Sequence, residues 1–271
     1  MASTTLNPLT ETMIREGMFK ATFPEARYIL DLLKAINAVA EEACFKITPE
    51  AIAVKAVDPS IMALVDFRLE KNASEEWVLD GHEELKMAVS LFEMLRIIGG
   101  AKSGEALTIA YDPEERKVRF ILLEATGSKK RDIYLNTLED FEGKDVTPKV
   151  EFKAMASLAT KALREAVEDC RLFNDIVKIR IDPEAVELSA RSDEGNALIR
   201  FPKYSSLIYE LEAEQETASH YSILYLSKML KAGLSLSDST RIDLAKDKPM
   251  KIGFEIPYGK LDYYLAPVIR S

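Results

Sequence analysis

The chain has 271 residues, of which 47% are hydrophobic and 30% are charged, and its formal net charge at pH 7 is −9. This composition is that of a globular protein with enough apolar material for two domains of ordinary size or one large one. The acidic balance argues against a sequence-specific DNA-binding domain, which is normally basic, although basic groups could be confined to one face.

The first 17 residues, MASTTLNPLTETMIREG, are polar and lack the apolar stretch of a signal peptide. We expect them to form a disordered extension, with the folded part beginning at Met18. No run of about 18 apolar residues follows, so the sequence predicts no membrane span. The only two cysteines, Cys44 and Cys170, come without an export signal, which favours a reducing, cytoplasmic location and no disulfide framework.

The first half of the folded chain predicts short alternating strands and two helices. A strand at 18–22 leads into a helix that has Pro24 near its first turn and apolar residues at helical spacing. A second helix, 91–98, stops at Gly99 and Gly100. The other predicted strands are 43–48, 51–57, 62–69, 106–112, 117–124 and 131–136.

The second half predicts the same order of elements. A strand at 150–154 precedes a helix from about Met155 to Asp169, further strands reach Leu211, and a helix lies around Ser222–Ala232. The closing strands are 240–245, 250–256 and 261–267. Between the halves, the acidic segment TLEDFEGKDVTPK contains Gly and Pro and is typical of a linker. The expected domains are therefore 18–136 and 150–271, joined by a connector at 137–149.

An internal repeat supports this division. The stretch ITPEAIAVKA at 47–56 returns as IDPEAVELSA at 181–190, 134 residues later. Two further pairs of segments match at nearly the same offset: 43–47 with 177–181, and 94–96 (Met-Leu-Arg) with 229–231 (Met-Leu-Lys). Asp-Pro and Thr-Pro are ordinary turn residues, but several matches in order at one offset indicate a duplicated domain.

Polar stripes run along the predicted helices, opposite the apolar ones. The residues in these stripes are Arg27, Asp31 and Lys34 in the first helix, Arg96 in the second, Ser157, Lys161, Arg164 and Glu168 in the third, and Lys228 and Lys231 in the fourth. One interpretation is that these are solvated helix faces. The other is that helices from both halves line one concave, mildly positive surface that contacts phosphates without reading bases.

No motif predicts catalysis or a bound metal or cofactor. HEELK at 82–86 begins like a zinc-protease motif, but Lys86 stands where the second histidine is needed. GGAKSGEA at 99–106 resembles a phosphate-binding loop, but Gly104 is followed by Glu105 instead of Lys and Ser or Thr. A helix end and a hairpin turn explain this segment better. We therefore expect a protein that is not an enzyme, with no cofactor and no metal.

Two stretches carry a resemblance to a known family: AVDPSIMALVDFRL at 56–69 and LDYYLAPVI at 261–269. They are similar to the sliding clamps of archaeal and eukaryotic replication, the proliferating cell nuclear antigen family. The similarity runs from Met18 to the C-terminus, and the second stretch matches the family's terminal Tyr-Tyr-Leu-Ala-Pro pattern. The chain departs from the family in its 17-residue extension and in the amino-acid sequence of its acidic connector.

The resemblance implies an α+β fold of two similar domains, each an antiparallel sheet with two helices. Three such chains would form a pseudo-sixfold ring whose helices line a hole for duplex DNA, bound without regard to sequence. The implied function is that of a processivity factor in DNA replication and repair. Its implied partners are DNA polymerase, the clamp loader, flap endonuclease and DNA ligase, in an archaeal cytoplasm beside the nucleoid. Each would hold the ring through a short apolar and aromatic motif, a glutamine followed by two aromatics.

The resemblance also implies three sets of site residues. The DNA-facing set is Arg27, Lys34, Arg96, Lys102, Lys161, Arg164 and Lys231, to which helical spacing adds Lys228. The partner-motif groove is Val57, Ile61, Met62, Leu64, Leu138, Pro249, Ala266, Pro267 and Val268. The subunit interface joins 129–136 of one chain to 196–203 of the next, through Lys129, Arg131, Ile133, Tyr134, Ala197, Ile199 and Phe201.

Two alternatives stay open at this point. The chain could be one subunit of a ring built from different chains. It could also be an oligomeric enzyme with a site between the duplicated halves, although no catalytic constellation supports this.

Overall fold

The structure, a computed structural model, describes residues 18–139, 141, 143 and 147–269. The expectation of disorder for residues 1–17 lies outside the described residues. In the first half the elements are β1 (Phe19–Phe23), α1 (Ala26–Asn37), β2 (Glu42–Ile47), β3 (Ala51–Val57), β4 (Ala63–Glu70), a 3₁₀ turn (Lys71–Ala73), β5 (Glu76–Leu79), β6 (Leu85–Ser90), α2 (Leu91–Ile98), β7 (Glu105–Asp112), β8 (Lys117–Glu124) and β9 (Lys130–Asn136).

The second half repeats this plan. Its elements are β10 (Ala154–Ala159), α3 (Thr160–Arg171), β11 (Ile176–Asp182), β12 (Ala185–Arg191), β13 (Asn196–Pro202), β14 (Ile208–Ala213), β15 (Thr217–Ser222), α4 (Ile223–Gly233), β16 (Ser239–Leu244), β17 (Met250–Ile256) and β18 (Gly259–Leu265). The prediction of two helices among antiparallel strands in each half is confirmed.

The prediction at the start of the second half is wrong. Residues 155–159, expected in a helix, form most of β10, and 150–153 lie outside any strand. β10 pairs with β14 on one side and β16 on the other, and the hydroxyls of Ser157 and Ser239 are 3.0 Å apart across that second pair. The stretch MASLA suits a helix as well as a strand, so only its two neighbouring strands decide its conformation.

The strands form three antiparallel sheets. Their orders are β5-β1-β7-β8-β9, β14-β10-β16-β17-β18-β4-β3-β2-β6 and β13-β12-β11-β15. The central sheet takes strands from both halves, because β18 pairs with β4 from Gly259 opposite Leu69 to Leu265 opposite Ala63. The two repeats are therefore joined through backbone hydrogen bonds as well as through side chains.

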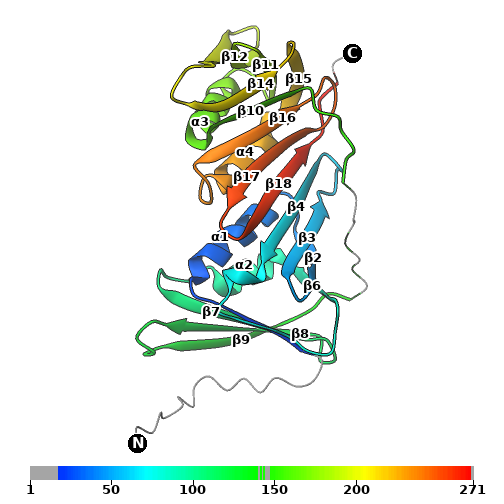
Figure 1. Cartoon of the computed structure of the whole chain (residues 1–271), viewed down its shortest axis with the longest axis vertical. Helices are drawn as coiled ribbons and strands as arrows, with labels where there is room; N and C mark the ends of the chain where they lie inside the picture. The colour runs from blue at the N-terminus through cyan, green and yellow to red at the C-terminus, as the bar shows by residue number, and fades with distance from the viewer. Residues whose placement is uncertain (1–17, 140, 142, 144–146, 270–271) are drawn as a thin grey trace, which may run out of the picture.

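All four helices of the described chain lie on one side of the sheets, as Figure 1 shows. α3 packs on α4, α4 on α1, and α1 on α2, so they make one continuous row, called the helix row below. Each helix buries an apolar stripe against the strands behind it. None of the described helices is long and apolar enough to cross a membrane.

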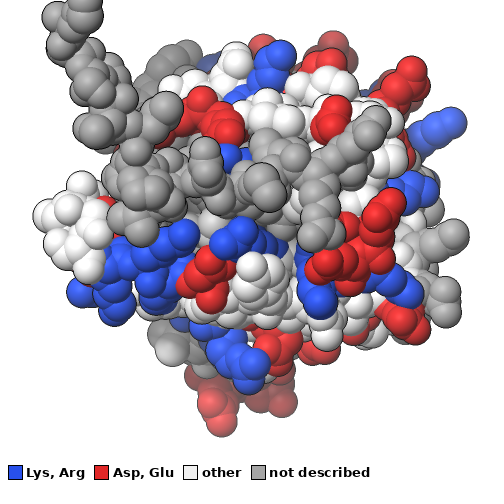
Figure 2. All heavy atoms as spheres, turned by 90° about the horizontal axis from the view of Figure 1, so that it is seen from below, with Lys and Arg blue, Asp and Glu red and all other residues white. Residues whose placement is uncertain are grey.

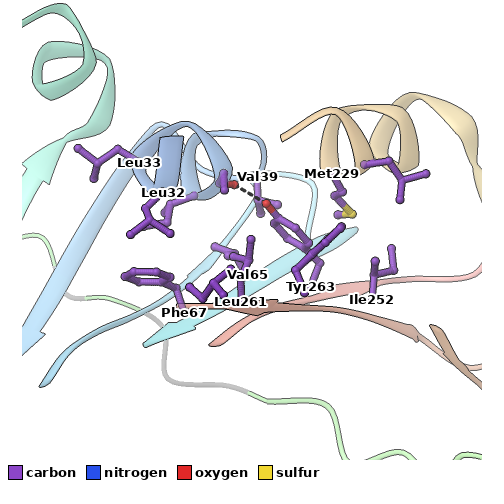
Figure 3. Close-up of a cluster of buried hydrophobic side chains, with 14 of the residues drawn as sticks. Leu32, Leu33, Val39, Val65, Phe67, Met229, Ile252, Leu261 and Tyr263 are labelled. Atoms are coloured by element: carbon purple, nitrogen blue, oxygen red, sulfur yellow. Dashed lines mark hydrogen bonds between the residues drawn. The ribbon is translucent and has the colours of Figure 1, made fainter. Parts of the chain in front are cut away.

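The core runs through the seam between the halves. Figure 3 shows its central part, where residues from α1, β4, β17, β18 and α4 meet: Leu32, Leu33, Val39, Val65, Phe67, Met229, Ile252, Leu261 and Tyr263. The hydroxyl of Tyr263, fully buried here, donates to the carbonyl of Ala35 at 2.8 Å. One apolar core thus serves both repeats.

Two more tyrosines cross the seam. The Tyr28 hydroxyl of α1 donates to the carbonyl of Pro257 at 2.6 Å, and the Tyr225 hydroxyl of α4 donates to Asp58 Oδ2 at 2.8 Å. Burial raises the pKa of Tyr28 to about 12. The phenol therefore stays protonated at neutral pH and keeps its role as a donor.

Candidate nucleic-acid and partner interfaces

The predicted DNA-facing residues lie along the helix row. α1 carries Arg27 and Lys34, α2 carries Arg96, α3 carries Lys161 and Arg164, and α4 carries Lys228 and Lys231. Lys102 follows α2 in the loop before β7. All of these except Arg164 are exposed. Because the sheets back the row on its other side, these cations occupy its free face.

Acidic neighbours moderate the positive charge of this face. Asp31 lies 3.6 Å from Arg27 and 2.8 Å from Lys34, Glu93 lies 2.5 Å from Arg96, and Glu165 lies 4.0 Å from Lys161. Exposed pairs of this kind are each worth about 0–1 kcal/mol. The row can therefore attract phosphates only weakly, which suits contacts that form and break quickly.

Arg164 and Ser157 differ from their predicted placement. Arg164 is only half-exposed, and its Nε is buried without a hydrogen-bond partner among the described residues. Ser157, expected in the same helical stripe, lies on β10. Glu168 accepts a hydrogen bond from Ser227 Oγ at 2.8 Å, so it ties α3 to α4. The exposed members of the predicted set in the second half are consequently Lys161, Lys228 and Lys231, of which Lys161 lies 4.0 Å from Glu165.

The loop between β3 and β4 is held by one buried carboxylate. Asp58 is 5% exposed, and its oxygens accept from the backbone N–H of Ala63 at 2.6 Å, from that of Ser60 at 3.1 Å, and from the Tyr225 hydroxyl. Loop 58–62 is therefore fixed at both ends and anchored to α4 of the other half.

Loop 58–62 presents Ile61 to solvent in a strained conformation. Its φ is +58°, and its side chain is 68% exposed. A positive φ is a genuine outlier for a β-branched residue and costs about 1–3 kcal/mol. An apolar side chain held outward at such a cost is typical of a binding surface.

Most of the predicted groove surrounds this loop. Val57 pairs with Leu64 across β3 and β4, and the N–H of Ala266 donates to the carbonyl of Met62 at 2.8 Å. Pro249 directly precedes β17, whose Met250 lies opposite Leu265. The predicted groove residues that are half-buried or exposed are Val57, Ile61, Met62, Pro249, Ala266, Pro267 and Val268, and this predicted set is called the apolar groove below.

Two residues of the predicted groove are placed differently. Leu64 is 5% exposed, so it supports the apolar groove from the core beneath it. Leu138 lies beyond β6, where its N–H donates to the carbonyl of Ala88 at 2.8 Å. In the central sheet β2 stands between β6 and β3, the strand that carries Val57, so the structure places Leu138 apart from the other predicted groove residues.

Replacing Asp58 with alanine is expected to destabilise the fold by about 2 kcal/mol or more, because buried donors lose a charged acceptor. Tyr225→Phe removes only the bond from α4 and should cost about 1 kcal/mol. Urea unfolding of the two variants checks the order of these losses. Equal stability of Asp58→Ala and the parent chain would contradict the anchoring role.

The two predicted interface strands are sheet edges. β9 ends the five-stranded sheet and β13 ends the four-stranded one, so each leaves one side without a partner strand in the described chain. Figure 1 shows β9 at one end of the molecule and β12, the neighbour of β13, at the other. Figure 2 looks onto the β9 end, where Lys and Arg side chains gather beside Asp and Glu.

The exposure of the side chains on these two strands differs in part from what the predicted set of interface residues requires. Ala197 and Ile199 are half-buried against the core, and Phe201 is buried. On the opposite face of β13, Leu198 is 63% exposed, a residue that the sequence prediction missed although strand alternation placed it there. On β9, Tyr134 is 57% exposed, with the Arg119 guanidinium 5.5 Å from its ring centre, whereas Arg131 and Ile133 are half-buried and Lys129 is exposed.

Within the described residues, no group of three or more His, Cys, Asp or Glu side chains could hold a metal ion. Cys170 is buried, which raises the pKa of its thiol to about 11, and Cys44 is half-buried.

Comparison with known proteins identifies the family to which the sequence of this chain is similar. Residues 18–142 match the family model described as proliferating cell nuclear antigen, N-terminal domain, and residues 146–268 match the C-terminal domain. A protein named DNA polymerase sliding clamp 1 from Pyrobaculum aerophilum is 31% identical over 250 residues, covering 92% of this chain and 98% of that one. The DNA polymerase sliding clamp of Thermofilum pendens is 28% identical over 252 residues, covering 92% and 99%.

Solved structures agree on the fold. The proliferating cell nuclear antigen of Thermococcus kodakaraensis superposes with a TM-score of 0.84 at 22% identity, covering 92% of this chain and all of that one. The corresponding protein of Entamoeba histolytica gives the same TM-score at 20% identity, covering 93% and 99%.

Proposed function

We propose that this chain, which belongs to the proliferating cell nuclear antigen family, is a DNA sliding clamp. Three copies close into a ring around duplex DNA and tether the replicative polymerase and other DNA-processing enzymes, so that these enzymes stay on the template. The chain itself catalyses no reaction, because enclosing DNA and holding enzymes requires only binding surfaces. We place it in an archaeal cytoplasm, associated with the nucleoid.

The observation that carries this proposal is the position of two free edge strands at opposite ends of a chain whose described helices lie on one side. An edge that pairs with a different edge on the next copy gives a head-to-tail contact, which closes into a ring when the rotation is right. Ring closure then removes both edges. The helix row faces the hole, and the central sheet faces outward.

The mild charge of the helix row fits this role. A closed ring stays on DNA because the two are linked topologically, so strong affinity for phosphates is unnecessary. The ion pairs along α1, α2 and α3 keep contacts weak while leaving some cations free. An acidic exterior and a weakly basic bore let the ring slide.

Retention on DNA of two shapes tests the proposal. We expect the ring, once loaded onto nicked circular DNA, to stay bound through gel filtration and to be lost when the same DNA is linearised. Equal retention on both forms, or on neither, would count against encirclement.

The subunit composition of the ring needs its own measurement. A trimer of the purified chain in light scattering supports a ring of identical subunits. A monomer at all concentrations supports the alternative, in which different chains make a mixed ring.

Reversing the charge of the exposed lysines of the helix row in the second half, with Lys161, Lys228 and Lys231 all changed to Glu, is expected to weaken DNA loading and retention at low salt without dissociating the trimer. The loss should be independent of base sequence and should shrink as salt rises, because screening already removes the attraction. A matched variant changes three lysines that lie off the helix row, Lys71, Lys153 and Lys246, to Glu as well. This variant should load normally. If both variants load alike at low salt, the helix row faces elsewhere.

A further inference from the structure

A pocket of about 670 Å³ lies on the outer face of the first half, beside the apolar groove. Its floor is made by β2, β3, β4 and β6, and its rim by the β7–β8 turn and the start of the connector. Leu138, predicted for the groove, lines this pocket. Because successive side chains alternate along a strand, Lys55 in the pocket and Val57 in the groove share one face of β3, two residues apart. The pocket, called the connector pocket below, therefore continues the groove.

The pocket opens where two strands part. β2 pairs with β3 only at Lys46 opposite Ala53 and at Ile47 opposite Ile52, whereas β3 stays paired with β4 from Ala51 to Val57. Gly143 of the connector lies against β2 at this place, so close that an added Cβ would be 3.2 Å from the Cβ of Cys44. The space is thus built into the sheet and the connector together.

The lining is cationic, in a chain with a net charge of −9. Lys46 and Lys86 stand directly opposite each other across β2 and β6, and Lys55 and Arg116 line the same pocket. Like charges directly opposite in a sheet destabilise it. Among the described residues of the lining, Asp66 is the one acidic residue, and it already pairs with Lys260 at 3.4 Å.

Ion pairs within the described chain neutralise the positive charge of the pocket only in part. Lys46 reaches Glu84 at 3.1 Å, and Arg116 reaches Glu139 at 2.9 Å, all four side chains being well exposed. Lys86 is exposed and has no ion pair with any described residue. An unfavourable pair of lysines in a preformed pocket beside a binding groove points to an anionic ligand group.

We propose that the connector pocket receives Asp or Glu side chains of the partner segment that flanks the apolar motif. The inference rests on the proposed clamp function, in which the apolar groove holds a partner motif of a glutamine followed by two aromatics. A motif whose glutamine lies near Ala266 and whose aromatics lie near Ile61 continues from β4 toward β6, so the acidic residues follow the aromatics. The pocket selects partners by the charge of this flank.

Three peptides test the inference. They share the glutamine and the two aromatics and differ only in three following residues, which are acidic, neutral or basic. By calorimetry at low salt, the acidic peptide should bind about tenfold more tightly than the neutral one, since several partly screened charge pairs form, and the basic one more weakly. The three affinities should converge as salt rises.

Charge reversal in the pocket locates the effect. Lys86→Glu should remove or invert the order of the peptides, while Lys71→Glu, at the opposite end of β4 from Ile61, makes the same change in net charge and should preserve it. Cys44 lines the pocket and Cys170 is buried, so thiol labelling of the native protein reports on the pocket. The acidic peptide should slow labelling of Cys44 more than the neutral one.

The outcomes separate the two proposals. If the neutral peptide binds and the acidic peptide gains nothing over it, the pocket inference is wrong and the groove stands. The same conclusion follows if Lys86→Glu keeps the preference. If no peptide binds, the groove assignment fails and the inference fails with it.

Discussion

Tyr134→Asp is expected to convert the ring into folded monomers. The side chain is exposed on the free edge of β9, so its replacement disturbs the isolated subunit little. In the ring it would place an unpaired charge between two strands, which costs several kcal/mol, on the order of the whole contact. Leu198→Asp on β13 should act in the same way, and Ile199→Asp should also give monomers, although its half-buried side chain adds a cost to folding.

Light scattering gives the mass of each variant, and thermal unfolding shows that the monomers are folded. Tyr258→Asp is the matched control, because Tyr258 is 59% exposed in the turn between β17 and β18, away from both edges. The control should remain a trimer. A full ring in Tyr134→Asp or Leu198→Asp would show that these edges do not join the subunits.

Loss of peptide binding is the second large effect expected. The double variant Ile61→Ala, Leu138→Ala should abolish binding of a short peptide with a glutamine and two aromatics, which the parent chain should bind with micromolar affinity, about −8 kcal/mol. Truncating the central apolar residues of such a groove commonly removes most of the binding free energy. The exposed side chain of Ile61 contributes little to the core, so assembly and DNA encirclement should survive.

Calorimetry on the two single variants measures how much of the binding free energy each residue contributes. Ile61→Ala should account for the larger share, because Ile61 lies among the other groove residues, whereas Leu138 lies beside β6, with β2 between it and the strand of Val57. Leu172→Ala, in a residue 76% exposed just after α3, removes a similar side chain elsewhere and should bind normally. Parent affinity in the double variant would mean that the groove lies elsewhere.

Local sequence signals predicted the elements whose ends are marked by particular residue types, such as glycine. The helix at 91–98 was predicted to the residue, because Gly99 and Gly100 follow it and its apolar spacing is clear. The repeat offset then predicted the matching helix of the second half, at Ile223–Gly233, to within a residue or so. The strands β5 and β6 were not identified, because β5 has only four residues, all half-buried, and β6 has consecutive buried residues in place of alternating ones.

Other features depend on distant parts of the chain. No local pattern indicates that β18 pairs with β4, that Asp58 is bound by Tyr225, or that Ile61 has a positive φ. The helical stripes predicted the cations of the helix row and their weakening by Asp31 and Glu165, but the pairing of Glu93 with Arg96 follows from side-chain geometry. The connector pocket requires the parting of β2 and β3, which alternation alone does not predict.

The pairing of β18 with β4 sets the order in which the chain can complete its fold. The paired residues are between 190 (Leu69 and Gly259) and 202 (Ala63 and Leu265) positions apart. A ribosome adding roughly 5–20 residues per second needs on the order of 10–40 s to make the intervening chain. During that time the nascent first repeat carries an open strand edge at β4, to which other nascent chains can add. The last strand to leave the ribosome is the one that closes this edge.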